Sequence, residues 1–300
     1  MTNYVASYIN PDMDGIACMI AIAKFLSRDG IKQYEPVRFG NVDFESQYVL
    51  GKLDLPAPRA VDSLCDAGDV VLVDTHHRAQ LPPGFPFEKV SLIIDHHPNG
   101  DEFANAKIIN EKVGAAASII AKMYLDAGLQ DEKILRLLGF AILSNTLNFN
   151  SSSTSEFDRE VFSEINKLYP ISEVEMIDMF QSRARIFEQG IRAAIESDLK
   201  EFDTKHGRVG ISQLSTPISI STLDTGEIIS ELSNIANDRR LKYLFFNCGD
   251  IVQNKGLLIA ANQETKELLE NIFRVPFANN IREFDRILFR KVDLVPALND

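Results

Sequence analysis

The first half of the chain alternates short apolar runs with longer amphipathic segments. Three runs have the length and apolar character of buried strands: residues 3–9, 70–73 and 90–94. Three longer segments place apolar residues at helical spacing: residues 15–30, 114–128 and 131–143. Because strands that alternate with helices form parallel sheets, the pattern predicts an α/β domain whose parallel sheet is covered by helices on both faces.

The pattern changes between residues 156 and 197, where the chain is helical and charged and shows no strand candidate. A second series of strand and helix patterns follows at residues 207–214, 227–238, 241–250, 256–262 and 286–295. A chain of 300 residues is also longer than one small core requires. We therefore expect two domains, residues 1–188 and 189–300, joined by a helical linker. The smaller C-terminal α/β domain is expected to contain a mixed sheet.

The composition is that of an ordinary soluble globular protein, with 45% hydrophobic and 25% charged residues. No apolar run approaches the roughly 20 residues that cross a bilayer, and the N-terminus lacks the pattern of a secretory signal. Three widely spaced cysteines without metal-ligand spacing indicate a reducing cytoplasm. The net charge of −12 disfavours nucleic acid as a partner, but it permits a small anionic substrate held through a metal ion.

Acidic and imidazole side chains are concentrated directly after the predicted strands. Four of the five histidines form two adjacent pairs, and each pair closely follows an aspartate that ends an apolar run. The residues concerned are Asp12 and Asp14 after the first run, Asp74, His76 and His77 after the second, and Asp95, His96 and His97 after the third. Since ligands bind at the carboxyl ends of parallel strands, these side chains are expected to converge.

Carboxylates and imidazoles together favour a divalent first-row metal such as Mn²⁺. Acids that are buried together oppose each other's ionisation unless cations lie between them, which is the physical argument for metal. Asp74 could bridge two ions, and two ions can stabilise the attacking and leaving oxygens of a phosphoryl displacement. Structural alternatives stay open: Asp12 as a helix cap, Asp95 as a partner that orients an imidazole, and His76 and His77 as an exposed loop.

The same segments resemble a known superfamily. NPDMDG (10–15), VDTHH (73–77) and IDHHPNG (94–100) look like the first three motifs of the DHH phosphoesterases, and residues 141–158 resemble the fourth. In the second half, SDLKEF (197–202), VGISQL (209–214) and FRKVDLVPAL (289–298) resemble the C-terminal domain of the manganese-dependent, family II inorganic pyrophosphatases and related exopolyphosphatases. The glycine-rich GGGH stretch typical of the exonuclease branch does not occur in the sequence.

The resemblance implies a metal-dependent phosphohydrolase that cleaves a phosphoanhydride, with inorganic pyrophosphate as the first candidate. It implies Mn²⁺, with Mg²⁺ or Co²⁺ as substitutes and two ions per site, one of them weakly bound. The implied ligands are Asp12, Asp14, Asp74, His96 and the amide of Asn145, and Asp74 is the catalytic bridging ligand. His97 would contact the substrate phosphate and act as a catalytic proton donor, while Lys200, Arg290 and Lys291 would bind phosphate from the second domain, at a cleft between the domains. An exopolyphosphatase or a small phosphodiesterase is the alternative within the superfamily.

Two positions depart from the pattern of the family. Tyr8 stands where members usually carry a histidine, and Asn145 stands where the fourth motif usually carries an aspartate. A phenol with a pKa of about 10 is a poor ligand at neutral pH, and an amide oxygen can coordinate but adds no charge. Three hypotheses follow: His76 or His77 replaces a lost ligand, the site binds metal weakly or singly, or the chain binds phosphorylated ligands without hydrolysing them. The helical segment 156–180 fits a homodimer interface or a linker equally well.

Overall fold

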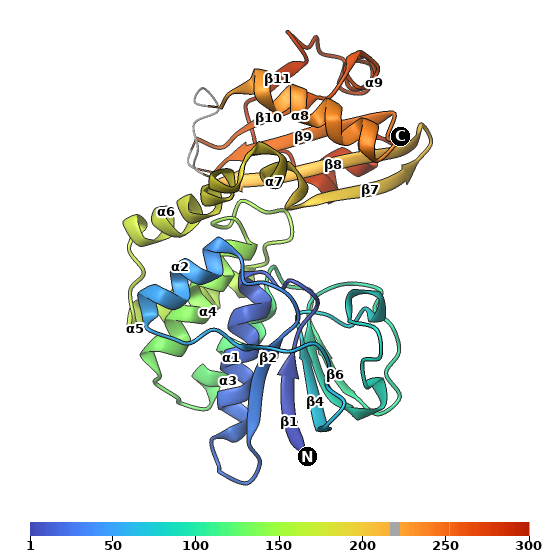
Figure 1. Ribbon diagram of the computed structural model, residues 1–300. Helices are drawn as coiled ribbons and strands as arrows, with labels where there is room; N and C mark the ends of the chain where they lie inside the picture. The colour runs from blue at the N-terminus through green and yellow to red at the C-terminus, as the bar shows by residue number, and fades with distance from the viewer. Residues whose placement is uncertain (217–222, 252, 300) are drawn as a thin grey trace. The chain divides into compact units, whose positions relative to one another are not determined.

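The computed structural model describes residues 1–216, 223–251 and 253–299 and forms one β-sheet in each of two units (Figure 1). The first unit comprises Met1–Met179 and the second Phe180–Asp300. Within the described residues, the first sheet has six strands and the second has five. The expected two-domain α/β architecture, with the smaller domain at the C-terminus, is therefore confirmed.

All strands of the first sheet run parallel, in the order β3-β2-β1-β4-β5-β6. Their bounds are β1 Thr2–Ala6, β2 Tyr34–Arg38, β3 Arg59–Ala60, β4 Ala67–Val73, β5 Val90–Asp95 and β6 Lys107–Asn110. The three central strands β1, β4 and β5 correspond to the predicted apolar runs, because strands covered on both faces are apolar along most of their length. The outer strands β2, β3 and β6 leave no such pattern, since they are short and partly exposed.

The two faces of this sheet are covered differently. The α-helices of the first unit are α1 Met13–Ser27, α2 Phe44–Leu53, α3 Ala116–Asp126, α4 Glu132–Asn145 and α5 Glu156–Leu168, and α6 Glu173–Ser182 crosses the boundary between the two units. Helices α1 and α3 pack against the strands on one face (Figure 1). The other face is covered by the short 3-10 helices η1 Arg78–Gln80 and η2 Phe87–Lys89 and their loops, where Leu81, Phe85 and Phe103 join the buried apolar cluster.

The second sheet is mixed, as expected, in the order β11-β10-β9-β8-β7. Its strands are β7 Leu199–Thr204, β8 Gly207–Thr216, β9 Tyr243–Asp250, β10 Lys255–Ala260 and β11 Ile281–Phe284, of which β8 and β9 are parallel and the other pairs antiparallel. The described helices of this unit are η3 Arg183–Gln189, α7 Ile191–Glu196, α8 Thr225–Asp238, α9 Gln263–Phe273, η5 Arg290–Leu294 and α10 Val295–Ala297. Buried apolar clusters fill both faces of the sheet.

The strand predicted at residues 286–295 is wrong. Strand β11 ends at Phe284, and Arg290–Leu294 form a single π-helical segment that leads into α10. The carboxylate of Asp293 accepts a hydrogen bond from the backbone N–H of Phe289 at 2.7 Å and a second from Arg286 at 2.6 Å, which holds the chain in a turn. Leu288, Leu294 and Val295 of this segment pack into an apolar cluster on the sheet rather than extend it.

No helix in the described part of the chain has the length and apolar character that crossing a bilayer requires. Cys18 and Cys248 are buried, Cys65 is exposed, and all three are free thiols.

Candidate metal centre

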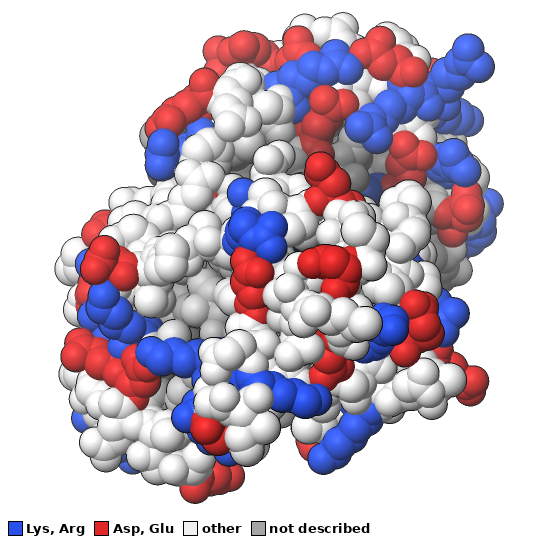
Figure 2. Space-filling model, turned by 60° about the horizontal axis from the view of Figure 1, so that its bottom comes forward, with Lys and Arg blue, Asp and Glu red and all other residues white. Residues whose placement is uncertain are grey.

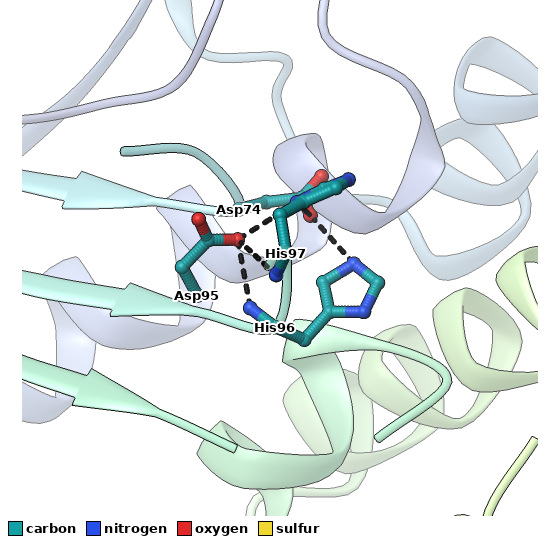
Figure 3. Close-up of side chains that lie close together, drawn as sticks. All are labelled: Asp74, Asp95, His96 and His97. Atoms are coloured by element: carbon teal, nitrogen blue, oxygen red, sulfur yellow. Dashed lines mark hydrogen bonds and ion pairs between the residues drawn. The ribbon is translucent and has the colours of Figure 1, made fainter. Parts of the chain in front are cut away.

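The predicted convergence occurs at the carboxyl ends of three neighbouring strands. Asp74 directly follows β4, and His96 and His97 directly follow Asp95, the last residue of β5. Asp14 lies in the first turn of α1, which follows the adjacent strand β1. Figure 3 shows Asp74, Asp95, His96 and His97 gathered at this edge, and one potential ligand atom from each of these four residues lies within 4.8 Å of the others.

Asp74 and His96 form the centre of the cluster. The Nε2 atom of His96 lies 3.2 Å from Oδ1 of Asp74 and 3.8 Å from Oδ2 of Asp14, and these three side chains are at most 10% exposed. Although His96 is near, Oδ1 of Asp74 is buried and accepts no well-aligned hydrogen bond from the described residues. An oxygen that lies beside an imidazole nitrogen and a second carboxylate, with no well-aligned donor, fits a metal ligand. Oxygen and nitrogen donors of this kind suit Mn²⁺.

The charges of the cluster are in conflict without a cation. Burial, followed by repulsion from Asp14, raises the pKa of Asp74 well above its ordinary value. Burial also raises the pKa of Asp14 to about 6. Burial lowers the pKa of His96, but the carboxylates of Asp74 and Asp14 outweigh burial and raise it to about 10. The raised pKa values mean that the cluster favours bound protons, which balance its negative charge. A divalent cation can balance the same charge.

Asp14 is fixed by the start of a distant helix. Its carboxylate accepts hydrogen bonds from the backbone N–H groups of Ala116 and Ala117, each at 2.8 Å, in the first turn of α3. The thiol of Cys18 donates to the same carboxylate at 3.4 Å. A carboxylate at a helix N-terminus is favoured by the unpaired N–H groups and by the helix dipole. The orientation of Asp14 therefore depends on α3 as well as on α1.

Asp12 is exposed and caps α1. Its Oδ1 accepts hydrogen bonds from the N–H groups of Asp14 at 3.0 Å and Gly15 at 3.2 Å. The capping role expected as an alternative is thus present, and Asp12 also contributes negative charge that raises the pKa of Asp14 and Asp74. The hydroxyl of Tyr8 accepts a hydrogen bond from the N–H of Asp12 at 3.1 Å. Burial and the carboxylates of Asp12 and Asp74 raise the pKa of Tyr8, so the phenol is neutral at physiological pH.

Asn145, at the end of α4, presents its amide nitrogen to this region. Nδ2 donates to the carbonyl oxygen of Gly114 at 2.9 Å and to Oδ2 of Asp14 at 3.1 Å, and it lies 3.5 Å from Nε2 of His96. Since two acceptor oxygens face this atom, the nitrogen rather than the oxygen must point toward them. The amide therefore holds Asp14 in place as a donor.

Asp95 lies between two imidazoles. Its Oδ1 accepts hydrogen bonds from Nδ1 of His97 at 2.9 Å and from the backbone N–H groups of His96 at 2.7 Å and His97 at 3.2 Å. Its Oδ2 is bonded to Nδ1 of His76. Burial raises the pKa of Asp95, but the hydrogen bonds from His97 and His76 outweigh burial and lower it. The geometry gives Asp95 the orienting position and leaves Nε2 of His97 available for other contacts.

Two of the three predicted cations of the second unit, Arg290 and Lys200, lie beside a residue that the sequence patterns did not single out. Arg290 is buried and donates to both carboxylate oxygens of Asp198 at 2.9 Å and to its backbone oxygen at 2.6 Å. Nζ of Lys200 lies 3.4 Å from the same carboxylate, and its side chain is 56% exposed. The side chain of Lys291 lies outside the part of the chain that the structure describes. The position of Asp198, two residues before Lys200 in the sequence, is the signal that could have indicated this pair.

Two family models match the chain. The model of the DHH family, N-terminal domain, matches residues 3–142, and the model of the DHHA2 domain matches residues 177–300. Between them, these matches include every residue of the candidate metal centre except Asn145.

Similar proteins match along nearly the full length. The "Manganese-dependent inorganic pyrophosphatase" of Bacillus subtilis (strain 168) is 29% identical over 299 residues, which cover 97% of this chain and 96% of the relative. The "Probable manganese-dependent inorganic pyrophosphatase" of Bacillus velezensis is 30% identical with the same coverage of 97% and 96%. Among solved structures, "Crystal structure of Methanococcus jannaschii putative family II inorganic pyrophosphatase" matches with a TM-score of 0.77 and 25% identity, covering 99% of this chain and 98% of that one.

Proposed function

Because the chain belongs to the DHH family, with a DHHA2 domain in its second unit and full-length relatives named manganese-dependent inorganic pyrophosphatase, we propose that it hydrolyses inorganic pyrophosphate with manganese. The observation that carries the proposal is the buried Oδ1 atom of Asp74, which lacks an aligned donor and lies beside His96. A divalent cation at this atom would satisfy the oxygen and relieve the repulsion between Asp74 and Asp14.

The proposed roles follow from the contacts of each side chain. Asp12, Asp14, Asp74 and His96 would hold manganese, with Asp74 shared between two ions, and Asn145 would act through Asp14 or turn its oxygen toward the metal. Manganese supplies Lewis acidity toward phosphoryl oxygens and neutralises the charge of the carboxylates. Nε2 of His97 would contact a phosphate oxygen and deliver a proton to the leaving phosphate, since Asp95 holds Nδ1 of the same ring.

The cations of the second unit are proposed to bind phosphate. Arg290 and Lys200 flank Asp198, and Lys291 follows Arg290 in the chain. A guanidinium offers two parallel donors to a phosphate, and a lysine offers a mobile charge. Asp198 already occupies the guanidinium of Arg290, so Arg290 would position the segment that carries Asp198 and Lys200. Lys200 is the more exposed of the two cations and would therefore contact the phosphate.

Phosphate release from pyrophosphate tests the proposal directly. The protein is assayed colorimetrically with added Mn²⁺, Co²⁺ or Mg²⁺, with the same ions in buffer alone as blanks. We expect turnover with Mn²⁺ and loss of turnover after chelation. Failure to release phosphate with every one of these ions would rule the activity out.

Hydrolysis of longer phosphate chains is the second candidate. A long polyanion requires an extended basic groove, whereas Figure 2 shows acidic and basic side chains interspersed over the face that it presents. This mixed surface, together with the net charge of −12, favours pyrophosphate. Rates measured on pyrophosphate, tripolyphosphate and longer oligomers separate the two candidates: a rate that increases with chain length would favour the exopolyphosphatase.

Binding without turnover is a third candidate, which Tyr8 and Asn145 motivate. Tyr8 carries a neutral phenol and Asn145 an N–H donor at places where charged or imidazole ligands would bind metal more tightly. The double variant Tyr8→His with Asn145→Asp tests whether these residues limit activity. A large increase in turnover supports degeneration of the site, and efficient turnover by the unchanged protein excludes it.

We propose that the two metal ions differ in affinity and that the protein works in the reducing cytoplasm. Tyr8 offers no strong ligand near Asp12, so the ion on that side would bind more weakly. Elemental analysis during dialysis at rising Mn²⁺ concentration should give one tightly bound ion and then a second.

The free thiols of Cys18, Cys65 and Cys248 fit a reducing compartment, which cell fractionation would check.

A further inference from the structure

Four imidazoles form a continuous row at the edge of the first sheet. The ring centroids of His96 and His97 are 4.4 Å apart, those of His97 and His77 are 6.4 Å apart, and those of His77 and His76 are 5.2 Å apart. The His76 and His77 rings are stacked, with an angle of 28° between their planes. His77 thus lies between the rings of His97 and His76 in this series of neighbouring imidazoles.

His77 differs from the other three histidines in its partners. Nδ1 of His76 and Nδ1 of His97 are both bonded to Asp95, and His96 is engaged through both ring nitrogens, by Asp74 and the backbone oxygen of Val113. The ring of His77, in contrast, has no hydrogen bond to any residue in 1–216, 223–251 or 253–299, and the residue is half-buried. Its two ring nitrogens are therefore available to a ligand.

His76 is a fixed support for this free imidazole. It is only 5% exposed, and its ring lies against Gly100 so closely that a Cβ atom on Gly100 would approach within 1.4 Å of Cδ2 of His76. The backbone N–H of Asp101 donates to the carbonyl oxygen of His76 at 2.9 Å. An imidazole held by a buried carboxylate, a glycine and a backbone bond has little freedom, so the face on which His77 stacks is well defined.

We propose that His77 is a substrate-contacting residue that donates a hydrogen bond to a phosphate oxygen next to His97. The inference rests on the proposed function, because it takes the substrate to be a small phosphoanhydride that reaches His97. A pyrophosphate spans two neighbouring phosphate groups, so one that contacts Nε2 of His97 comes within reach of the next imidazole in the row. A neutral imidazole N–H is a suitable donor to a phosphate oxygen.

The replacement of a lost metal ligand by His76 or His77 stays a hypothesis. Nδ1 of His76 is bonded to Asp95, which leaves its Nε2 as the nitrogen that could bind a metal. A role in substrate binding uses the free nitrogens of His77 where they are found.

Binding of imidodiphosphate, a non-hydrolysable analogue of pyrophosphate, tests the inference. Calorimetric titrations with saturating Mn²⁺ compare the unchanged protein with His77→Ala, His77→Asn and His77→Gln. We expect His77→Ala to weaken binding about tenfold, the effect of losing one hydrogen bond to a charged group. One of the two amide variants should restore most of the affinity, namely the one that places its N–H where the donating ring nitrogen of His77 lies. His206→Ala is the matched control, since His206 is an exposed histidine in the β7–β8 turn, and it should bind as the unchanged protein does.

The outcomes separate this inference from the proposed function. If the unchanged protein binds imidodiphosphate and His77→Ala binds it equally well, the His77 inference is overturned while the proposed function stands. If the unchanged protein neither binds imidodiphosphate nor hydrolyses pyrophosphate, both are overturned. Weaker binding by His77→Ala with an unchanged melting temperature, a normal Mn²⁺ affinity and rescue by Asn or Gln supports the inference. Equal weakening in all three variants, with a lowered melting temperature, would identify His77 as structural and overturn it.

Discussion

Nε2 of His96 lies 3.2 Å from Oδ1 of Asp74, although the two residues follow different strands, β5 and β4. Register places them there: β4 and β5 are paired in parallel with Val73 opposite Ile94, so their carboxyl ends lie side by side. In this pair, Oδ1 of Asp74 has no well-aligned hydrogen-bond donor among the described residues. Nδ1 of His96 is bonded to the carbonyl oxygen of Val113 at 3.0 Å.

The first prediction concerns the charge of Asp74. Asp74→Asn keeps the shape of the side chain but removes the anionic ligand, so we expect Mn²⁺ binding to weaken and pyrophosphate hydrolysis to fall by about 100-fold or more. Calorimetry and phosphate release measure the two effects. Asp126→Asn, on the exposed end of α3, is the control and should match the unchanged protein. Full activity in Asp74→Asn would contradict the metal centre.

The second prediction concerns proton release. The metal-free pKa of His96 is about 10 and that of Asp14 is about 6, both above their ordinary values, so His96 carries a proton at neutral pH. Manganese requires the bare nitrogen, and binding must therefore displace a proton. The apparent affinity should rise with pH between about 6 and 10, by up to about tenfold per pH unit for one proton. Titrations in buffers of different ionisation enthalpy measure the protons released, and a value of zero at pH 7 would disprove the account.

The third prediction concerns Asn145→Asp. The change removes the N–H donor to Gly114, so the carbonyl oxygen of Gly114 is left facing a carboxylate, and Asp14 loses a donor as well. Without metal, the free energy of unfolding should decrease by about 1–3 kcal/mol. With metal, the added charge should increase Mn²⁺ affinity. Urea unfolding in chelator and in Mn²⁺ measures both effects. Asn150→Asp is the control for the same loss at the surface, since its amide donates to backbone oxygens in an exposed turn beyond α4. Equal stability of variant and unchanged protein under both conditions would show that the amide is not held as described.

The fourth prediction concerns the contact between Gly100 and His76. A Cβ on Gly100 would overlap the His76 ring, so Gly100→Ala should lower the free energy of unfolding by about 1–3 kcal/mol. If this contact is the cause, the double variant Gly100→Ala with His76→Ala should be more stable than the sum of the single effects implies, by about 1 kcal/mol or more. Denaturant unfolding of the four proteins measures the coupling. Gly51→Ala is the control, because a Cβ atom on Gly51, in α2, would contact nothing within 4 Å. Gly84→Ala is unsuitable because the positive φ of 76° at Gly84 would strain an alanine. Strict additivity would argue against the contact.

The fifth prediction concerns Glu175, in the first turn of α6. Burial raises its pKa, but hydrogen bonds from Ser172 and then from Lys52 and Arg136 outweigh burial and lower the pKa to about 2. Because the folded state favours the ionised form, the stabilisation is complete above the ordinary pKa of 4.5 and is lost as pH falls toward about 2. Glu175→Gln should cost about 1–3 kcal/mol at pH 7 and progressively less below pH 4.5. Unfolding followed at several pH values, with exposed Glu173→Gln as control, checks both sign and window.

Apolar patterning predicted the central strands and the helices that cover them, but not every element. Val70–Val73 lie in a strand because buried parallel strands need apolar side chains on both faces. Ile287 and Leu288 are equally apolar, yet they cover the second sheet from a loop. Apolar side chains that are buried one by one from a loop give the same sequence pattern as a buried strand. Only long-range packing distinguishes the two.

The sequence alone indicated which acids and imidazoles stand at the ends of β4 and β5, because run length and polarity mark where a buried strand stops. Which atoms meet there was decided by the tertiary structure: Asp14 with the first N–H groups of α3, Asn145 with the oxygen of Gly114, and Asp95 with His76 and His97. The reason is physical. A hydrogen bond depends on the positions of both partners to within a few tenths of an ångström, and most of these partners come from distant segments that the packing of the whole core brings together.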